Sequence, residues 1–275
     1  MTRGGAGAAS ALVALVLVLP ATAGAGPNLL TDPFQLSLGT FILDVDPSVR
    51  LDGETQTGTD VDWKRAFGLG DAARFRVDGA WRFSDRHKLR ASWFSDSRDR
   101  TASFDREVAW GDETFAVDAE VRGSLDFDIY QLGYEYSFQQ TSRYELTASA
   151  GLHVTDIRAA LAASAAVDAS AQGAFSSDIG KATAPLPVLG LAGLWSLPGN
   201  FWLNARGEYF YLALGDYEGR IQNYRVALTW QPRTWLGLGL SYDYSSLEID
   251  IDRTAFTGKL DWTYRGPMLF YSASF

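Results

Sequence analysis

Apolar residues alternate with small or polar residues along several stretches of this chain. The alternation is clearest over 74–83, 144–154 and 236–244, where nearly every second side chain is apolar and its neighbours are charged, polar or small. Successive side chains of a β-strand point to opposite faces, so a period of two predicts strands that are apolar on one face only. Each stretch has about the 9 to 11 residues that a tilted strand needs to cross a membrane.

The segments that connect these stretches are alternately short and long. The short ones are rich in turn-forming residues and lie at 84–87, 139–142, 197–200 and 231–234. The longer and more polar ones lie at 45–72, 97–118, 161–182 and 247–255. Aromatic residues flank the short turns, as the aromatic girdle of a membrane barrel would require. They are Phe83, Phe138, Tyr144, Trp195, Phe201, Trp202, Trp230 and Trp235.

The pattern predicts an all-β fold, a transmembrane antiparallel up-and-down β-barrel. Backbone groups find no water in hydrocarbon, so the sheet must close on itself. Ten strands fit the turns best; twelve are possible if 97–118 carries an extra hairpin, and eight are the third alternative. The ten predicted strands cover roughly 33–45, 72–84, 86–97, 118–138, 142–158, 183–197, 200–214, 217–231, 234–247 and 254–275.

The C-terminal segment adds a resemblance to a known group of proteins. Residues Leu269 to Phe275 alternate and end on an aromatic side chain, which resembles the final strand of bacterial outer-membrane β-barrels. The whole chain is similar in pattern to uncharacterised small outer-membrane barrel proteins of proteobacteria. The resemblance implies that Tyr271 and Phe275 form a signal for the barrel assembly machinery. It also implies a bacterial outer-membrane location, among lipids and lipopolysaccharide, and it brings no catalytic residues.

The N-terminal segment predicts export. Arg3 supplies a positive charge, 11–19 is an apolar run, and Ala21-Thr22-Ala23 is a small-residue cleavage site. We therefore expect a signal peptide over residues 1–23 and the barrel over residues 24–275. Removal of the peptide leaves about 250 residues, a size that one all-β barrel can fill.

The side on which apolar residues fall changes within the last predicted strand. Apolar residues occupy even positions up to Tyr264 and odd positions from Leu269 onward, and Arg265-Gly266-Pro267 lies between them. A one-residue bulge has this effect, and bulges tolerate Pro and Gly. A similar change occurs near Ile129-Tyr130. The sequence therefore predicts a bulge or bend at 265–267.

Composition narrows the possible function. The formal net charge of −9 and the pI near 4.7 argue against nucleic-acid binding, which needs basic surfaces. The nine Trp, twelve Tyr and sixteen Phe argue against the alternative of a water-soluble periplasmic β protein. The chain has no cysteine, no pair of histidines at ligand spacing and no phosphate-binding glycine loop. We expect no metal, no cofactor and a monomer.

Charged residues occupy the face opposite the apolar one, so they should point into the lumen. The set contains six arginines, five carboxylates and one histidine: Arg74, Arg76, Asp78, Arg82, Arg90, Glu135, Glu145, His153, Arg206, Glu208, Arg225 and Asp243. A ten-stranded barrel is only slightly wider than an eight-stranded one, whose interior side chains fill it. We therefore expect the arginines to pair with the carboxylates. The alternative is a narrow conduit whose arginines select small anions.

No catalytic constellation is recognisable. Omptin proteases share the predicted strand number, but neither His87 nor His153 belongs to an Asp-x-His pair. Lipid A deacylases of the outer membrane need a Ser–His pair on the lipid-facing surface, and His153 falls on the lumen side. We expect a largely closed barrel with a structural or ligand-binding role and no enzymatic activity. A porin-like channel for small anionic solutes is the alternative, and an outer-membrane hydrolase is the third possibility.

Overall fold

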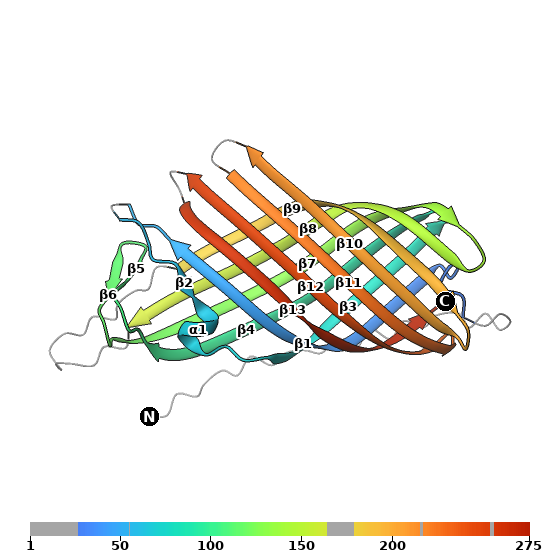
Figure 1. Ribbon diagram of the computed structural model, residues 1–275, viewed down its shortest axis with the longest axis horizontal. Helices are drawn as coiled ribbons and strands as arrows, with labels where there is room; N and C mark the ends of the chain where they lie inside the picture. Colours follow the sequence, from blue (N-terminus) through green and yellow to red (C-terminus); the bar gives the residue numbers. More distant parts are fainter. Residues whose placement is uncertain (1–26, 55, 164–178, 215–216, 254–255) are drawn as a thin grey trace, which may run out of the picture.

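Ten long strands of the chain close into an antiparallel barrel (Figure 1). The computed structural model describes residues 27–275 apart from 55, 164–178, 215–216 and 254–255. Each barrel strand pairs with the next, and the last pairs with the first, which confirms the predicted ten-stranded closed barrel. The strands are β1 (Phe34–Leu51), β3 (Ala72–Ser84), β4 (His87–Ser103), β7 (Glu120–Gln140), β8 (Tyr144–Ala163), β9 (Ile179–Leu197), β10 (Phe201–Leu214), β11 (Tyr217–Arg233), β12 (Leu236–Arg253) and β13 (Phe256–Ser274).

The four short turns lie where the sequence predicts them, and they mark one end of the barrel. We call the half of the barrel next to them the turn half and the other half the loop half. Several strands extend further into the loop half than predicted; β1, for example, ends at Leu51 instead of residue 45. Within the described part of the chain, no helix is long and apolar enough to cross a membrane.

Two of the longer connections contain small elements of their own. The segment after β1 forms β2 (Val61–Asp62) and the short helix α1 (Trp63–Phe67), and the segment after β4 forms the hairpin of β5 (Val108–Trp110) and β6 (Glu113–Phe115). Asp62 caps α1 by accepting a 2.8 Å hydrogen bond from the Arg65 N–H. The β5–β6 hairpin is a separate sheet, so the extra hairpin exists but does not raise the strand number to twelve.

The predicted bulge at 265–267 is wrong. β12 and β13 pair without interruption from Gly237↔Ser272 to Arg253↔Phe256. Position 266 has to be glycine, because a Cβ there would lie 1.9 Å from the Ile42 carbonyl oxygen of β1. Since the backbone alternation is regular, the change in apolar positions means that large side chains move from the outside of the barrel to its inside.

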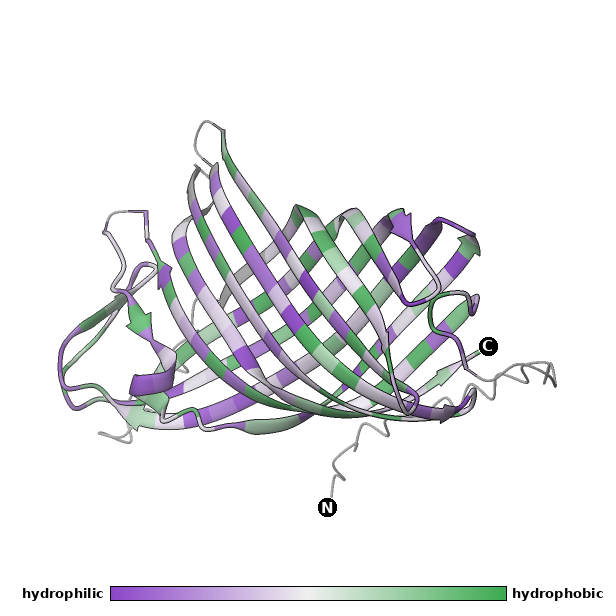
Figure 2. Ribbon diagram, turned by 45° about the vertical axis from the view of Figure 1, so that its right-hand side comes forward, coloured by the Kyte–Doolittle hydropathy of each residue, from purple (hydrophilic) through white to green (hydrophobic). Residues whose placement is uncertain are grey.

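In the turn half, apolar side chains point outward. Each of the following is more than a third exposed: Leu38, Phe75, Trp93, Leu132, Leu152, Leu189, Leu191, Tyr224, Leu240 and Leu269. Their strands alternate between green and purple residues in Figure 2. An exposed apolar surface of this kind matches a lipid-facing band with a polar interior.

In the loop half, apolar side chains point inward and form a continuous core. Its buried members include Phe41, Leu43, Val45, Phe94, Leu125, Phe127, Ile129, Ile157, Leu186, Ile221, Leu247, Ile249, Trp262 and Tyr264. The ring centroids of Phe127 and Trp262 are 4.5 Å apart at 73°. The loop half is therefore built like a water-soluble barrel, with apolar residues inside and polar residues such as Glu248 and Asp250 outside.

Helix α1 completes this core from the first long connection. The Trp63 ring centroid lies 4.9 Å from that of Phe67 and 6.1 Å from that of Trp110 in β5. Phe67 also packs on β7 at Gly123, where a Cβ would lie 2.5 Å from the ring. The glycine is needed because the ring lies directly on the strand.

The barrel wall has an unpaired seam between the loop-half ends of β9 and β10. The β9–β10 ladder ends at Leu189↔Tyr209, although β9 stays paired with β8 up to Ile179. The Ser196 N–H of β9 donates to the carbonyl oxygen of Arg143, the residue just before β8, at 2.7 Å. Even-numbered N–H groups of β9 therefore face β8, and odd-numbered ones face β10. Pro185 and Pro187 occupy odd positions and supply no donor to β10. The ends of β9 and β10 in the loop half consequently diverge (Figure 1).

A turn at Asn28–Asp32 lies at the opening of the turn half. Gln35 and Gln140 donate from their side chains to the carbonyls of Leu29 and Leu30, at 2.8 and 3.0 Å. Leu29 and Leu30 are buried against Trp202 of β10. The apolar core and this turn therefore bound the polar lumen of the turn half from both ends.

Candidate functional site

The lumen of the turn half contains a cavity of about 180 Å³. Inward-facing positions of β3, β4, β7, β8, β10, β11 and β12 bring charged side chains to it, because every second residue of a strand points inward. The charged residues in its lining are five cations and five carboxylates: Arg76, Lys88, Arg90, Arg206, Arg225, Asp78, Glu135, Glu145, Glu208 and Asp243. They form two clusters.

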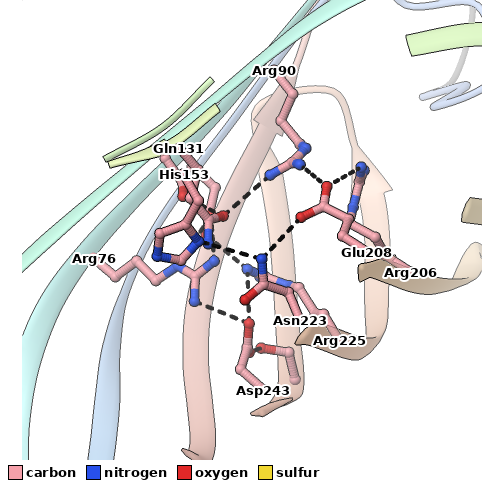
Figure 3. Close-up of polar contacts among 12 residues, drawn as sticks. Arg76, Arg90, Gln131, His153, Arg206, Glu208, Asn223, Arg225 and Asp243 are labelled. Atoms are coloured by element: carbon pink, nitrogen blue, oxygen red, sulfur yellow. Dashed lines mark hydrogen bonds and ion pairs between the residues drawn. The ribbon is translucent and has the colours of Figure 1, made fainter. Parts of the chain in front are cut away.

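The first cluster lies next to the apolar core and contains two arginines and two aspartates. Arg76 contacts Asp243 at 2.9 Å and Asp78 at 3.0 Å, and Arg225 contacts the same two carboxylates at 3.5 and 3.1 Å. Figure 3 shows Arg76 and Arg225 meeting at Asp243. The Arg76 guanidinium also lies 5.6 Å from the ring centroid of Phe94. The cluster is electrically neutral, and Arg76 connects it to the core of the loop half.

The second cluster contains seven residues, and we call it the seven-residue cluster. Its members are Arg82, Lys88, Arg90, Arg206, Glu135, Glu145 and Glu208. Four cations share three carboxylates, so the cluster has a formal charge of +1. Each carboxylate contacts at least two cations, which leaves no carboxylate free to compensate the extra charge.

Glu145 and Glu135 hold most of the seven-residue cluster together. Both Glu145 oxygens accept 2.9 Å hydrogen bonds from Arg82, a bidentate pair, and Lys88 lies 2.7 Å from Oε2. Glu135 contacts Arg206 at 2.5 Å and both Lys88 and Arg90 at 3.3 Å. These carboxylates are almost fully buried, so their charge depends on the cations around them.

Glu208 joins the seven-residue cluster to His153. It pairs with Arg90 and accepts a 3.3 Å hydrogen bond from the amide of Asn223 (Figure 3). His153 Nδ1 lies 3.2 Å from Gln131 Nε2 and 3.3 Å from Asn223 Nδ2. Both neighbours are amide donors, so Nδ1 accepts and the ring is neutral with its proton on Nε2. These two hydrogen bonds involve neither a carboxylate nor a nucleophile.

The structure brings eleven of the twelve predicted lumen residues into the turn half. Arg74 is the exception, because it faces the loop half and pairs with Asp96, which also binds Arg98. Sequence reasoning missed Lys88, Asp96 and Arg98 of β4, although they fall on the same alternate, even-numbered positions as Arg90. It also missed Gln131, which falls on the same face of β7 as Glu135, and Asn223, which falls on the same face of β11 as Arg225. Alternation within the predicted strands could have found all of these except Arg98, which lies beyond the predicted end of its strand at residue 97.

The other residues that the sequence singled out lie elsewhere. Tyr271 faces outward and is 40% exposed, and Phe275 exchanges backbone hydrogen bonds with Phe34 at the turn end. His87 contacts the Tyr134 hydroxyl at 2.6 Å. Within the residues described, no group of three or more His, Cys, Asp or Glu side chains has the arrangement of a metal site.

The fold can be compared with known structures. It is similar to the outer membrane protease OmpT of Escherichia coli, with 13% sequence identity, a TM-score of 0.57 and coverage of 89% of this chain and 97% of that one. Ail of Yersinia pestis matches with 12% identity and a TM-score of 0.38, over 88% of this chain and 98% of that one. The Pseudomonas putida toluene transporter TodX matches with 12% identity and a TM-score of 0.35, over 89% and 90%.

At such low identity the likeness to OmpT concerns the fold alone. No protein-family model matches this chain, and no curated protein matches it. The chain therefore has the fold of bacterial outer-membrane β-barrel proteins, a group with diverse roles, and its own role has to be argued from its lumen.

Proposed function

We propose that the protein is an integral protein of the bacterial outer membrane whose lumen is closed at rest. It holds a structural or ligand-binding role there and transports no solute. Lipids and lipopolysaccharide surround it, and the barrel assembly machinery recognises its last strand through Tyr271 and Phe275. It acts as a monomer without a cofactor.

One observation carries this proposal: the apolar core that fills the loop half. A water-filled path would have to pass Phe41, Phe94, Phe127 and Trp262, each of which is at most 2% exposed. Interiors packed in this way leave few voids larger than a water molecule. At the turn end, Leu29 and Leu30 narrow the lumen further. The paired charges between these two barriers then stabilise the closed barrel.

Electrical recording in planar lipid bilayers tests the proposal. The purified protein should give no steady unitary conductance. A double variant, Trp63→Ala with Phe67→Ala, removes the aromatic contacts of α1 and should produce conductance if this helix helps to seal the loop half. Trp235→Ala is the control, because Trp235 is 57% exposed on the outer surface. Steady anion-selective channels of the unmodified protein at neutral pH would overturn the proposal.

Two other functions rank below this one. The extra positive charge of the seven-residue cluster would favour anions if the lumen conducted, which supports the channel as the second candidate. A hydrolase is third, because His153 Nδ1 accepts hydrogen bonds from two amides and contacts no nucleophile through them. Stable anion conductance would favour the second candidate, and release of a fatty acid or peptide by the purified protein would favour the third.

A further inference from the structure

The cavity of the turn half has features of a ligand site. We propose that it binds a small organic monocarboxylate, with the seven-residue cluster holding the carboxylate group. This inference rests on the ligand-binding form of the proposed function. Three properties support it: the positive charge of the buried cluster around the cavity, the unpartnered donors in the lining and the apolar side of the lining.

The buried charge around the cavity leaves room for one anion. The lining alone has five cations and five carboxylates, and Arg82, which pairs with Glu145 just outside the lining, brings the enclosed total to +1. The first cluster is neutral, whereas the seven-residue cluster has four cations and three carboxylates. An uncompensated charge in a buried site is costly, since the surrounding protein solvates it poorly. One monovalent anion between Arg90, Arg206 and Lys88 would bring the enclosed charge to zero. A dianion or a neutral sugar would not.

Unpartnered hydrogen-bond donors lie in the same lining. Thr147 of β8 is 2% exposed and Trp202 of β10 is 6% exposed, and both line the cavity. Within the part of the chain described here, neither Thr147 Oγ1 nor Trp202 Nε1 has a hydrogen-bond partner. Buried donors usually have partners, and an indole N–H can only donate. An acceptor such as a carboxylate oxygen would supply one.

The size and the apolar side of the cavity exclude a bare ion as its best ligand. Leu29, Leu194, Trp202 and Phe270 contribute apolar surface beside the charges. An apolar cavity of about 150 Å³ accommodates benzene, so about 180 Å³ has room for a short aliphatic chain or one aromatic ring beside a carboxylate. Chloride would compensate the charge and leave the apolar side unfilled. Benzoate matches both parts and serves as the probe.

The position of the cavity suggests the route of entry. The apolar core closes the loop side, whereas Leu29 belongs both to the cavity lining and to the turn at Asn28–Asp32. Three side-chain hydrogen bonds hold this turn, from Gln35, Gln140 and Ser274. A ligand from the turn side would reach the cavity by displacing this turn and no barrel strand. The site would therefore take its ligand from the side of the membrane that the short turns face.

Equilibrium binding of radiolabelled benzoate to the full chain in detergent micelles tests the inference. Benzamide has nearly the same shape without the charge, so it measures partition into the micelle. Benzoate should bind saturably to one site per chain, and benzamide should not. Binding of benzoate no stronger than that of benzamide, or no stronger than that of chloride, would overturn the inference.

Charge variants sharpen the test. Arg206→Gln cancels the extra charge of the seven-residue cluster and should weaken benzoate binding about tenfold or more, the effect of one charged hydrogen bond. Glu208→Gln raises the formal charge to +2 and should tighten binding. Arg220→Gln is the matched control, because Arg220 pairs with Glu248 at 2.5 Å on the outer surface. Unchanged affinity in both lumen variants would overturn the inference.

Thr147→Val covers the case in which the charge variants fail to fold. It keeps the shape and charge of the site and removes one donor, so benzoate should bind about two- to tenfold more weakly. Heat-modifiable gel migration reports folding of each variant. Absent benzoate binding together with absent conductance would overturn this inference alone. Steady conductance of the unmodified protein would overturn the closed lumen itself.

Discussion

The turn half and the loop half of the barrel use the same ten strands with opposite polarity. In the turn half, apolar residues face outward and charges face the lumen. In the loop half, apolar residues face inward and charges face outward, except for the buried pair of Asp96 and Arg98. The strands continue through both halves without a change of register in β12–β13. The surroundings therefore decide which face is apolar: hydrocarbon around the turn half and water around the loop half.

The two halves are also stabilised by different interactions. The turn half is held by buried ion pairs, whose strength depends on every partner being present. The loop half is held by packed side chains, where the cost of a change depends on the volume lost. The seam between β9 and β10 belongs to the loop half, which lies beyond the lipid-facing band and can leave backbone groups to water.

The largest effect should come from breaking the charged cluster of the turn half. Glu135→Ala leaves Arg206, Lys88 and Arg90 short of a buried carboxylate. It should lower the free energy of unfolding by about 3 to 5 kcal/mol. Urea unfolding followed by heat-modifiable gel migration measures the change. Glu54→Ala is the control in an exposed loop, and equal effects of both would contradict a network role for Glu135.

A leucine pair on β7 compares packing in the two halves directly. Leu125 is fully buried in the loop half, and Leu132 is 56% exposed on the outer face of the turn half. Leu125→Ala should cost about 2 to 5 kcal/mol, because it leaves a cavity in the core. Leu132→Ala should cost clearly less. If urea unfolding showed the opposite order, the apolar core of the loop half would not be the stabilising element.

Two arginine substitutions on β12 test where the lipid-facing band ends. Leu240→Arg places a charge on the exposed apolar face and should cost about 2 to 4 kcal/mol in lipid. Ser246→Arg lies on the same face of the same strand but in the loop half, and it should cost about 0 to 1 kcal/mol. Unfolding in lipid vesicles measures both. Similar costs would mean that the band extends beyond Tyr244.

The seam offers a smaller test of the same comparison. Pro185→Val with Pro187→Val restores two donors on the β10 side of β9, so the ladder should extend toward Tyr211. Each new hydrogen bond should add about 0.5 to 1.5 kcal/mol. Slower amide hydrogen exchange at Tyr211 and Ala213 would report it. Pro232→Ala, in the turn after β11, should leave the exchange of these two amides as it was.

The smallest effect concerns the outer surface of the loop half. Asp44 of β1 lies 2.5 Å from Lys64 of α1 and 3.1 Å from Arg265 of β13. Partial burial raises the pKa of Asp44, but hydrogen bonds and charge from Lys64 and Arg265 outweigh it and hold the pKa below the ordinary 3.8. A lowered pKa stabilises the fold above the ordinary value, and this contribution disappears as the pH falls through the folded-state pKa.

Asp44→Asn should therefore cost about 0 to 1 kcal/mol at pH 7, as is usual for partly exposed pairs. The cost should vanish in strong acid, because the carboxylate of the unmodified protein is then protonated too. Urea midpoints at pH 7 and pH 2 measure this. A cost that is the same at both values would show that shape, and not charge, is what Asp44 provides.

The sequence could predict most of the residues that form the charged site, but not which of them form ion pairs. Strand parity placed Arg76, Glu135 and Asp243 in the lumen, because alternation fixes the face on which each residue falls. Strand parity could not show that Glu145 of β8 takes two cations, since Arg82 of β3 and Lys88 of β4 lie on strands that do not pair with β8. The extra positive charge of the seven-residue cluster also depended on Lys88, which sequence reasoning omitted.

The sequence by itself determined that the chain forms a closed barrel, since alternation, short turns and the need to satisfy backbone groups in hydrocarbon act locally along each strand. Only the tertiary structure decided what the change of apolar positions at Tyr264 means. A bulge and a passage from lipid to water give the same linear pattern. They differ in whether β13 keeps its register with β12 and β1, and that pairing joins residues far apart in the sequence.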